Sequence, residues 1–326
     1  MSDITLVEAI NQALAYEMQA DSSVVILGED IGKDGGVFRA TVGLLDQFGP
    51  ERVRDTPLAE SMIGGLAIGM ALQGLKPVAE FQFMGFIYPA LDQIINHAVR
   101  IRNRTRGRLQ CPVVFRTPYG CGIHAPEHHS ESTEALFAHI PGLRVVIPSS
   151  PVRAYGLLLA AIRDPDPVIF LEPSRLYRWA KQSVPNDGQA LPLDTCFTLH
   201  VGTDVSLVTW GAMVKETMAV ARQLAQEGIS AEVIDVATLK PLDMATILTS
   251  VAKTGRCVII HEAARTGGIG ADISAQIAEQ GLLFLQAPIQ RVTGYDIPVP
   301  YPRLEKFYLP GEEQILAAVH HVMEFA

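Results

Sequence analysis

The chain has 326 residues, of which 48% are hydrophobic and 19% are charged, and its formal net charge is −9. This length is enough for two ordinary domains, and the high apolar content predicts that part of the surface is buried against other subunits. The acidic balance argues against broad nucleic-acid binding, because neutralising phosphates requires a basic footprint.

The first half of the chain alternates helix and strand patterns. Residues 5–20 have helical apolar spacing, and "SVVILGED" reads as a strand buried on both faces, as in parallel sheets. A glycine-laced helix begins in "ESMIGG", and its glycines predict close approach of another backbone or a ligand. Further helices are expected in "DQIINHAVRIRNRT" and "RAYGLLLAAIRD", and further strands in "KPVAEF", "CPVVFRTP", "GLRVVIPSS" and "PVIFLEP".

The periodicity weakens over residues 179–203, which contain prolines and polar residues, so we expect a domain junction there. A second series follows, with strands in "DVSLVTWG", "SAEVIDV" and "CVIIHEA", a helix in "MVKETMAVARQLAQEG" and another beginning near Gly270. Such alternation predicts an α/β protein with two domains, residues 1–185 and 200–326, each with a mostly parallel sheet covered by helices.

The cysteines and the apolar segments exclude several classes of protein. Cys111, Cys121, Cys196 and Cys257 lie far apart without a C-x-x-C pair, so we expect neither a zinc site nor a disulfide framework. No apolar stretch reaches the length of about 18 residues that a membrane span requires, and the first residues lack signal-peptide features. These features predict a cytoplasmic protein.

Ligands of open parallel sheets bind at the carboxyl ends of the strands, so polar residues that follow the strands are candidates. Four groups do so: Glu29–Asp30, Gln82–Phe86, the loop 117–132 and the segment 261–272. The loop is long and carries glycine, proline and three histidines, which is more typical of a functional loop than of a structural one.

Within this loop, "APEHHSES" contains adjacent histidines, His128 and His129. Ser130 suits the N-cap of a helix over residues 131–140, which would put His129 at the positive helix end and favour a neutral imidazole for acid–base work. A metal site is disfavoured because neighbouring side chains diverge and only His124 is near as a third ligand. The alternative is a pair of solvated loop histidines without a function, and the spacing alone favours neither interpretation.

Glu60 lies between a proline turn and the apolar, glycine-rich helix. Loss of water around such a carboxylate raises its affinity for a proton, which makes it a candidate to share a proton with a ligand nitrogen. A glutamate that stabilises the helix dipole is the alternative. No dinucleotide fingerprint, P-loop or nucleophile elbow is present.

Five segments carry a resemblance to a known family: "ITLVEAINQAL", "GEDIGKDGGVFRATVGL", "DTPLAESMIGGLAIGMALQGLKPVAEFQF", "HHSES…PGLRVVIPSSP" and "DPVIFLEPSRLYR". They resemble the β subunit of thiamin-diphosphate-dependent 2-oxo acid dehydrogenases, most of all the bacterial pyruvate dehydrogenase type. "GAMVKETMAVARQLAQEGISAEVIDVATLKPLD" extends the resemblance into the second domain. The resemblance implies a pyrimidine-binding domain followed by a transketolase-type C-terminal domain.

The resemblance also implies roles for particular residues. Glu60 matches the glutamate that hydrogen-bonds the aminopyrimidine ring of the cofactor, and His129 matches a histidine that orients substrate or lipoyl group and handles protons. Leu58, Gln82 and Phe86 match positions that line the pyrimidine pocket, and Phe86 replaces the tyrosine of some relatives. The implied reaction is oxidative decarboxylation of pyruvate with acyl transfer to lipoyl groups.

One motif of thiamin enzymes is missing. The Gly-Asp-Gly segment with a later asparagine, which holds Mg²⁺ and diphosphate, is not found; "KDGG" is the nearest segment. Because the metal requires oxygen ligands, the resemblance implies that an α subunit supplies the diphosphate and Mg²⁺ site in an α2β2 heterotetramer. A self-sufficient transketolase-like enzyme is therefore disfavoured.

The family docks onto a lipoyl acyltransferase, for which acidic Glu312, Glu313 and Glu324 are candidate contacts, and some relatives bind K⁺ where Ala161, Asp164 and Asp166 lie here. Branched-chain 2-oxo acids and acetoin remain alternative substrates, because much of the substrate pocket belongs to the α subunit. A non-catalytic scaffold that binds the acyltransferase is the alternative of a different class.

Overall fold

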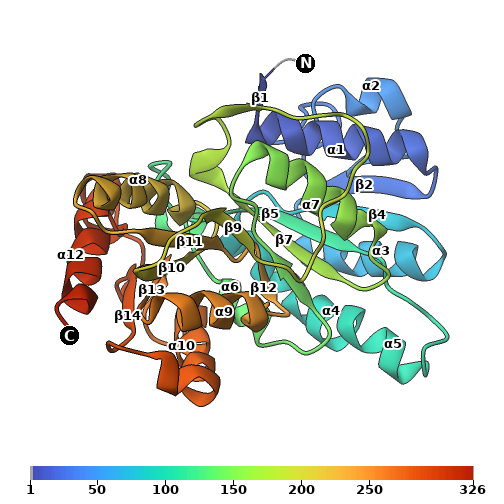
Figure 1. Cartoon of the computed structure of the whole chain (residues 1–326). Coiled ribbons are helices and arrows are strands. Elements are labelled where there is room, and N and C mark those ends of the chain that lie inside the picture. Colours follow the sequence, from blue (N-terminus) through green and yellow to red (C-terminus); the bar gives the residue numbers. More distant parts are fainter. Residues whose placement is uncertain (1–2, 326) are drawn as a thin grey trace.

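Two α/β domains lie side by side in the computed structural model, which describes residues 3–325 (Figure 1). The first contains a seven-stranded sheet with strand order β12-β6-β7-β5-β4-β2-β3, and the second a five-stranded sheet with order β14-β13-β10-β11-β9. Along residues 3–325, none of the helices has the length and apolar character needed to cross a bilayer.

The first sheet is parallel except for its edge strand β12. Its central strands β2 and β7 are buried along their whole length, as expected for strands covered on both faces. Its strands are β2 (Val24–Gly28), β3 (Val53–Asp55), β4 (Lys76–Glu80), β5 (Val114–Tyr119), β6 (Arg144–Val146), β7 (Val168–Pro173) and β12 (Thr238–Lys240).

Helices cover both faces of this sheet. Helices α1 (Leu6–Ala20) and α7 (Pro151–Arg163) pack together on one face, and Thr5 with Glu8 forms a capping box at the start of α1. The other face carries α3 (Glu60–Leu72), α4 (Leu91–Asn96), α6 (Glu134–Ala138) and the 3-10 helix η1 (Met84–Ala90). The remaining elements are α2 (Leu44–Phe48), η2 (Ala98–Arg100), α5 (Ile101–Arg104), η3 (Glu127–His129) and η4 (Ser174–Leu176).

The second sheet is parallel except for β9, and α8 and α12 lie on one face with α9 and α10 on the other. Its strands are β9 (Phe197–His200), β10 (Val205–Thr209), β11 (Ala231–Asp235), β13 (Cys257–Ala264) and β14 (Gln290–Gly294). Its helices are α8 (Met213–Gln226), α9 (Met244–Thr254), α10 (Ile269–Gly281), η5 (Leu282–Phe284), α11 (Pro302–Tyr308) and α12 (Glu312–Met323). A small sheet pairs β1 (Asp3–Thr5) with β8 (Lys181–Ser183).

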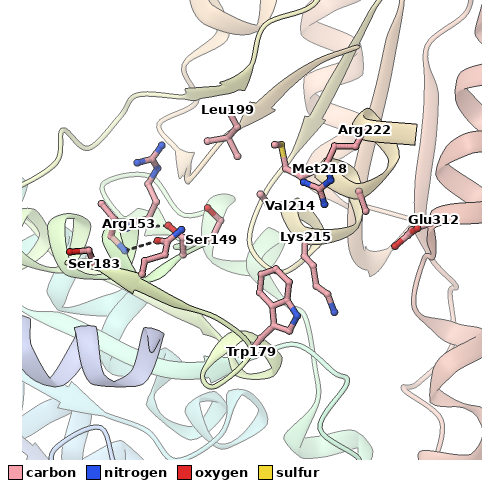
Figure 2. Close-up of a pocket in the computed structure, with 14 residues that line it drawn as sticks. Ser149, Arg153, Trp179, Ser183, Leu199, Val214, Lys215, Met218, Arg222 and Glu312 are labelled. Carbon is pink, nitrogen blue, oxygen red and sulfur yellow. Dashed lines mark hydrogen bonds between the residues drawn. The ribbon is translucent and has the colours of Figure 1, made fainter. Parts of the chain in front are cut away.

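A cavity of about 660 Å³ opens between the two domains, next to the first turns of α7 and α8 (Figure 2). Its lining includes Arg153 and Trp179 from the first domain and Lys215 and Arg222 from the second. Of the residues that the sequence singled out, Glu312, a candidate acyltransferase contact, lies in this lining, whereas the candidate active-site residues do not.

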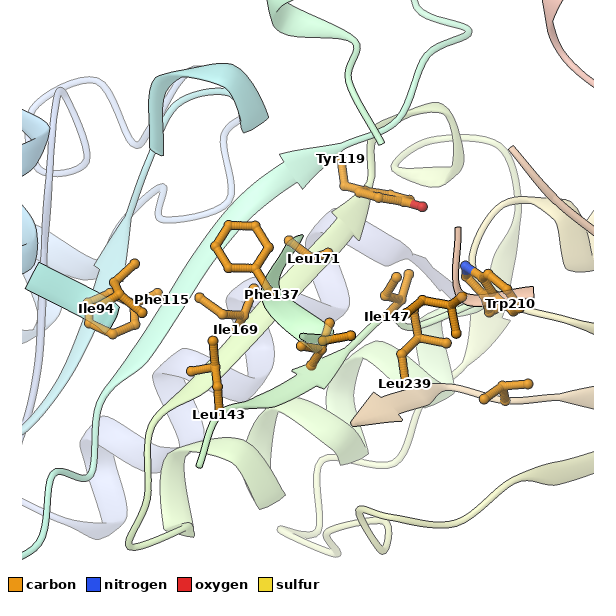
Figure 3. Packing of buried hydrophobic residues seen from close by; sticks show 14 of the residues in the cluster. Ile94, Phe115, Tyr119, Phe137, Leu143, Ile147, Ile169, Leu171, Trp210 and Leu239 are labelled. Carbon is orange, nitrogen blue, oxygen red and sulfur yellow. The ribbon is translucent and has the colours of Figure 1, made fainter. Parts of the chain in front are cut away.

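The domains also share one hydrophobic cluster. Phe137 and Ile147 of the first domain belong to the same cluster as Trp210 and Leu239 of the second (Figure 3). Strand β12 strengthens this connection, because it leaves the second domain and pairs antiparallel with β6 of the first sheet. The two domains are therefore held in a fixed arrangement by burial of apolar surface.

Candidate active site

Polar residues gather at the carboxyl ends of β2, β4 and β5, which are neighbours in the first sheet. Glu29 and Asp30 follow β2, and Gln82, after β4, donates a hydrogen bond from Nε2 to Asp30 Oδ2 at 3.2 Å. The loop that carries His129 follows β5. The hydrogen bond between Asp30 and Gln82 shows that the carboxyl ends of β2 and β4 meet at one edge of the sheet.

His129 lies against two aromatic rings. Its ring centroid is 4.2 Å from that of Phe83 and 5.0 Å from that of Phe86, both in edge-on geometry. The side chain is half-buried, and among the described residues its Nδ1 has no hydrogen-bond partner. His128 is exposed and packs on the outer side of Phe86 at 5.4 Å. A histidine with a fixed ring and a free nitrogen can bind or transfer a proton at a ligand.

The prediction of a helix over residues 131–140 is wrong about the residue at which the helix begins. Ser130 ends the 3-10 helix η3 and donates from Oγ to the Ala125 carbonyl oxygen, whereas helix α6 begins only at Glu134, after Thr133. The local hydrogen bonds of the "PEHHS" turn compete with helix formation. His129 therefore does not lie at the first turn of α6, and the helix-dipole argument for its neutral form does not apply.

Glu60 is the first residue of α3 and is half-buried. The nearby Glu29 is buried, and its Oε1 has no hydrogen-bond partner in the described part of the chain. Burial, followed by the charges of Glu60 and Asp30, raises the pKa of Glu29. The Glu29 carboxyl group therefore interacts with the charge of Glu60 at this edge of the sheet.

The 3-10 helix η1 connects the surroundings of Glu60 with those of His129. Ser61, next to Glu60, donates from Oγ to the Pro89 carbonyl oxygen at 2.6 Å, and Phe86 of the same 3-10 helix touches His129. A Cβ on Gly64 would lie 3.2 Å from that of Ala90, which explains why α3 carries glycine there. Leu58 remains 77% exposed, so this chain alone does not enclose the site on that side.

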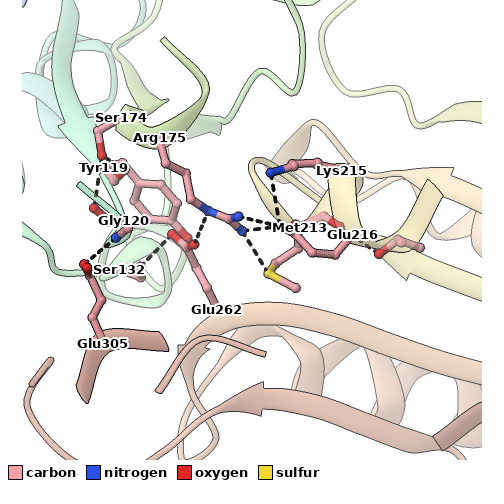
Figure 4. A network of polar contacts seen from close by, with 12 residues as sticks. Tyr119, Gly120, Ser132, Ser174, Arg175, Met213, Lys215, Glu216, Glu262 and Glu305 are labelled. Carbon is pink, nitrogen blue, oxygen red and sulfur yellow. Dashed lines mark hydrogen bonds and ion pairs between the residues drawn. The ribbon is translucent and has the colours of Figure 1, made fainter. Parts of the chain in front are cut away.

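Carboxylates of the second domain anchor the His129 loop (Figure 4). Ser132 donates from Oγ to Glu262 Oε1 at 3.0 Å, and a side chain at Gly120, whose φ is +82°, would collide with the same carboxylate. Glu305 accepts the Gly122 N–H, and its Oε2 is 2.7 Å from His124 Nδ1. The position of the loop that carries His129 therefore depends on contacts between the two domains.

Replacing Glu262 by glutamine is expected to stabilise the protein more at neutral pH than at acidic pH. Burial, with a further contribution from the charge of Glu134, raises the pKa of Glu262 from 4.5 to about 7, although Arg175 and Ser132 oppose the shift. A raised carboxyl pKa gives stability that is present below pH 4.5 and is lost as the pH rises to about 7.

Glutamine does not titrate, so the difference in melting temperature between variant and parent should grow across that pH range. Thermal unfolding followed by circular dichroism measures it. The exposed Glu279 at the end of α10, changed to glutamine, is the control. A difference that does not change with pH would contradict the assignment.

At the predicted potassium site, the carboxylates of Asp164 and Asp166 already have hydrogen-bond or ion-pair partners within the chain. Asp164 accepts the Asp166 N–H at 2.8 Å and lies 3.1 Å from Arg144, and Asp166 lies 2.7 Å from Arg102. Ala161 is buried in α7, and its carbonyl oxygen accepts the Asp164 N–H. Potassium binding at these residues stays a prediction, and it would have to use backbone carbonyl oxygens.

The histidine-based metal site is not supported by the geometry. His124, the third ligand that such a site needs, pairs with Glu305 instead. Over residues 3–325 there is no group of three or more histidine, cysteine, aspartate or glutamate side chains placed to hold a metal ion.

Comparison with known proteins gives the chain a family. Residues 2–180 match the model of the transketolase pyrimidine-binding domain, and residues 196–315 match that of the transketolase C-terminal domain. The chain is 49% identical to the pyruvate dehydrogenase E1 component subunit β of Acholeplasma laidlawii over 98% of both chains. It is 46% identical to that of Bacillus subtilis over the full length of both. The chain belongs to the pyruvate dehydrogenase E1 β-subunit family.

The family explains the architecture seen above, and the structural comparison agrees with it. A split-gene transketolase, solved as an inactive β4 tetramer, superposes with a TM-score of 0.82 over the whole of both chains at 23% identity. At that identity the match shows the fold alone. Fold class and family membership are therefore confirmed, whereas the roles of the site residues stay predictions.

Proposed function

We propose that this chain is the β subunit of the decarboxylating component of a pyruvate dehydrogenase complex and that its site binds the aminopyrimidine half of thiamin diphosphate. The full-length similarity to E1 β subunits of several bacteria carries the proposal. The site geometry supports it, because a half-buried glutamate begins a helix that contacts the same 3-10 helix as His129.

The side chains at this edge of the sheet fit an aromatic, nitrogen-rich group. Glu60 would bind at a ring nitrogen of the cofactor, because its carboxylate can accept a hydrogen bond from an N–H group. Gln82 and Phe86 would line the ring with an amide and an aromatic face, and Leu58 would cover it. When bound, the cofactor supplies the electron sink that decarboxylation of a 2-oxo acid requires.

His129 would act on the substrate side. Phe83 and Phe86 hold its imidazole, whose Nδ1 is buried without a hydrogen-bond partner among the described residues, and each imidazole nitrogen can donate or accept one hydrogen bond. This arrangement suits orientation of the 2-oxo acid and transfer of a proton during acyl transfer to a lipoyl group.

The diphosphate and Mg²⁺ would be held by an α subunit in an α2β2 heterotetramer. Apolar side chains beside the site support such a partner: Val37, Val42, Leu58, Met62 and Leu66 are all exposed in the isolated chain. Helix α3 carries apolar residues on its outer as well as its inner face, which is typical of a helix that is buried from all sides. The partner would also shield Glu60 from water.

Changing Leu66 to glutamate is expected to weaken assembly with the α subunit without unfolding the chain. Leu66 is 40% exposed on α3, so the charge stays in water in the free chain but would be buried in the assembled enzyme. Size-exclusion chromatography with light scattering on the co-expressed subunits measures the effect. The control is Leu136→Glu, which is similarly exposed on α6; equal assembly of the Leu66 variant and its control would count against this interface.

We propose that the acyltransferase docks on the C-terminal domain through the acidic residues of helix α12 and its end. Glu312 and Glu313 are exposed in the first turn of α12, and Glu324 follows its last turn, about 17 Å farther along the axis. These glutamates therefore form two separate acidic positions. We expect Glu312→Lys with Glu313→Lys, and Glu324→Lys separately, to reduce acyltransferase affinity unequally in calorimetry; unchanged binding in both would exclude docking through these charges.

The decisive experiment is dye reduction dependent on a 2-oxo acid by this chain co-expressed with its α subunit, with thiamin diphosphate and Mg²⁺ present. Preference for pyruvate over 3-methyl-2-oxobutanoate, and a requirement for both chains, is the expected result. Preference for the branched acid would move the assignment to a branched-chain enzyme. No activity with either acid in a stable heterotetramer would favour acetoin cleavage or a scaffold role.

A further inference from the structure

The cavity between the domains has the size and lining of a small-molecule site. Its volume of about 660 Å³ lies within the range typical of ligand pockets, about 300–1,000 Å³. Val152, Leu199, Val214 and Met218 form apolar walls, and Trp179 closes one side (Figure 2). The cavity is separate from the loop that carries His129.

The cavity also lies where α/β sheets bind ligands. Ser149 and Ser150 follow β6 of the first sheet and lead into α7, and Val214 and Lys215 stand in the first turn of α8, which follows β10 of the second sheet. The carboxyl ends of parallel strands from both sheets thus face one space. Helix α7 begins there with Ser150 as its N-cap.

The lining is positively charged although the chain is not. Among the described residues that line it, Arg153, Lys215 and Arg222 are cationic and Glu312 alone is anionic, so the lining has a formal charge of +2. The whole chain has a formal charge of −9. A local excess of cations in an acidic protein attracts anions.

Arg153 is poorly neutralised. Its guanidinium carbon lies 3.8 Å from the Phe197 ring centroid, and its nearest carboxylate oxygen, on Asp235, is 4.0 Å from Nε. That Nε is buried and, among the described residues, donates no hydrogen bond. Burial lowers the pKa of Arg153. A half-buried cation with one weak counter-charge is stabilised by an anionic ligand.

Two further residues extend the site. Arg222 is exposed at the rim, and within residues 3–325 no carboxylate pairs with it. Trp179 is 54% exposed, with the Lys215 ammonium 4.9 Å from its ring centroid. An exposed indole beside a cation offers a surface on which a flat ring can stack.

We propose that this cavity binds an organic anion of mononucleotide size through the charges of Arg153 and Arg222, with its flat ring on Trp179. The site goes beyond the proposed decarboxylation, because the cavity shares no residue with the candidate active site. Bound between the domains, such a ligand would also stabilise their contact by mass action.

The two tryptophans make a direct test possible. Trp179 is exposed in the cavity and Trp210 is buried elsewhere, so a ligand that stacks in the cavity changes the emission of Trp179. We expect adenosine monophosphate to change this emission saturably in the full chain and in the assembled heterotetramer, and Trp179→Phe to abolish the change. Adenosine and inorganic phosphate, each lacking one part of the ligand, should bind more weakly.

Variants of the arginines decide whether charge recognition is involved. Arg222→Met and Arg153→Met are each expected to weaken binding about tenfold or more, because each removes a charge-assisted hydrogen bond. Arg222 is exposed, so its variant is expected to fold, and the exposed Arg108, changed to methionine, is the matched control. Absence of saturable binding, equal binding of adenosine, unaffected arginine variants, or loss of the site on assembly would each overturn the proposal.

Discussion

Replacing Arg116 by methionine is expected to lower the free energy of unfolding by about 3–5 kcal/mol, the usual effect of removing one partner from a buried ion pair. The Arg116 side chain is 2% exposed and binds Glu172 through Nε at 2.7 Å, with Glu80 as its second carboxylate partner. Tyr177 also donates to Glu172, at 2.6 Å. Without the guanidinium, two carboxylates remain in the core of the first sheet.

The pH dependence of this loss tests the cause. Burial raises the pKa of Glu80, and the charge of Arg116 opposes that shift. In the variant this opposition is gone, so the carboxyls are more stable protonated, and the loss of stability should increase from mildly acidic to mildly alkaline pH. Urea unfolding of the variant and the parent, at one mildly acidic and one mildly alkaline pH, measures this loss of stability.

The exposed Arg54, whose pair with Glu51 lies in water, provides the control as Arg54→Met, with an expected loss of at most about 1 kcal/mol. An Arg116 variant that unfolds at the same urea concentration as the parent would contradict the role of the network.

The central strands could be predicted from the sequence because they are short segments rich in apolar, mostly β-branched residues. Strands β2, β5, β7, β10 and β11 were expected from their own residues, and each is buried along its length. Local composition is sufficient where a strand is covered on both faces.

Short edge strands could not be predicted in this way. Strand β12 is formed by three residues of the second domain that pair with β6, and β1 pairs with β8, which lies far along the chain. Such pairing depends on long-range contacts and leaves no periodic pattern in three residues. The helix expected over residues 92–105 is also divided, because His97 has a non-helical backbone with φ −121° and ψ −67°.

The candidate site was only partly predictable for the same reason. Gln82 and Asp30 were found because both follow strands, and strand ends meet at one edge. Phe83, which holds the His129 ring, and Glu262, which anchors the loop from the second domain, lie within candidate segments, but the sequence pattern predicts a role for neither of them. Their roles come from contacts made across the fold. Glu262 had one signal in the sequence, its place directly within strand β13 beside a histidine.

Replacing Glu60 by glutamine is expected to lower turnover of pyruvate about 10²–10⁴-fold in the enzyme assembled with its α subunit, which is the usual contribution of a positioned acid–base group. Glutamine keeps the size and most hydrogen bonds of the side chain but cannot take up or release the proton. The measurement is dye reduction at saturating pyruvate, with thiamin diphosphate binding determined separately by calorimetry.

The same substitution has a second consequence that needs no activity. The charge of Glu60 helps to raise the pKa of Glu29, so glutamine at position 60 removes a repulsion, and the melting temperature should stay equal or rise. Loss of turnover with unchanged stability then identifies a chemical role, whereas loss of both identifies a folding defect. Glu51→Gln, in an exposed side chain of the same domain, should change neither quantity. Parental turnover in the Glu60 variant would remove the carboxylate from the mechanism and leave the scaffold role standing.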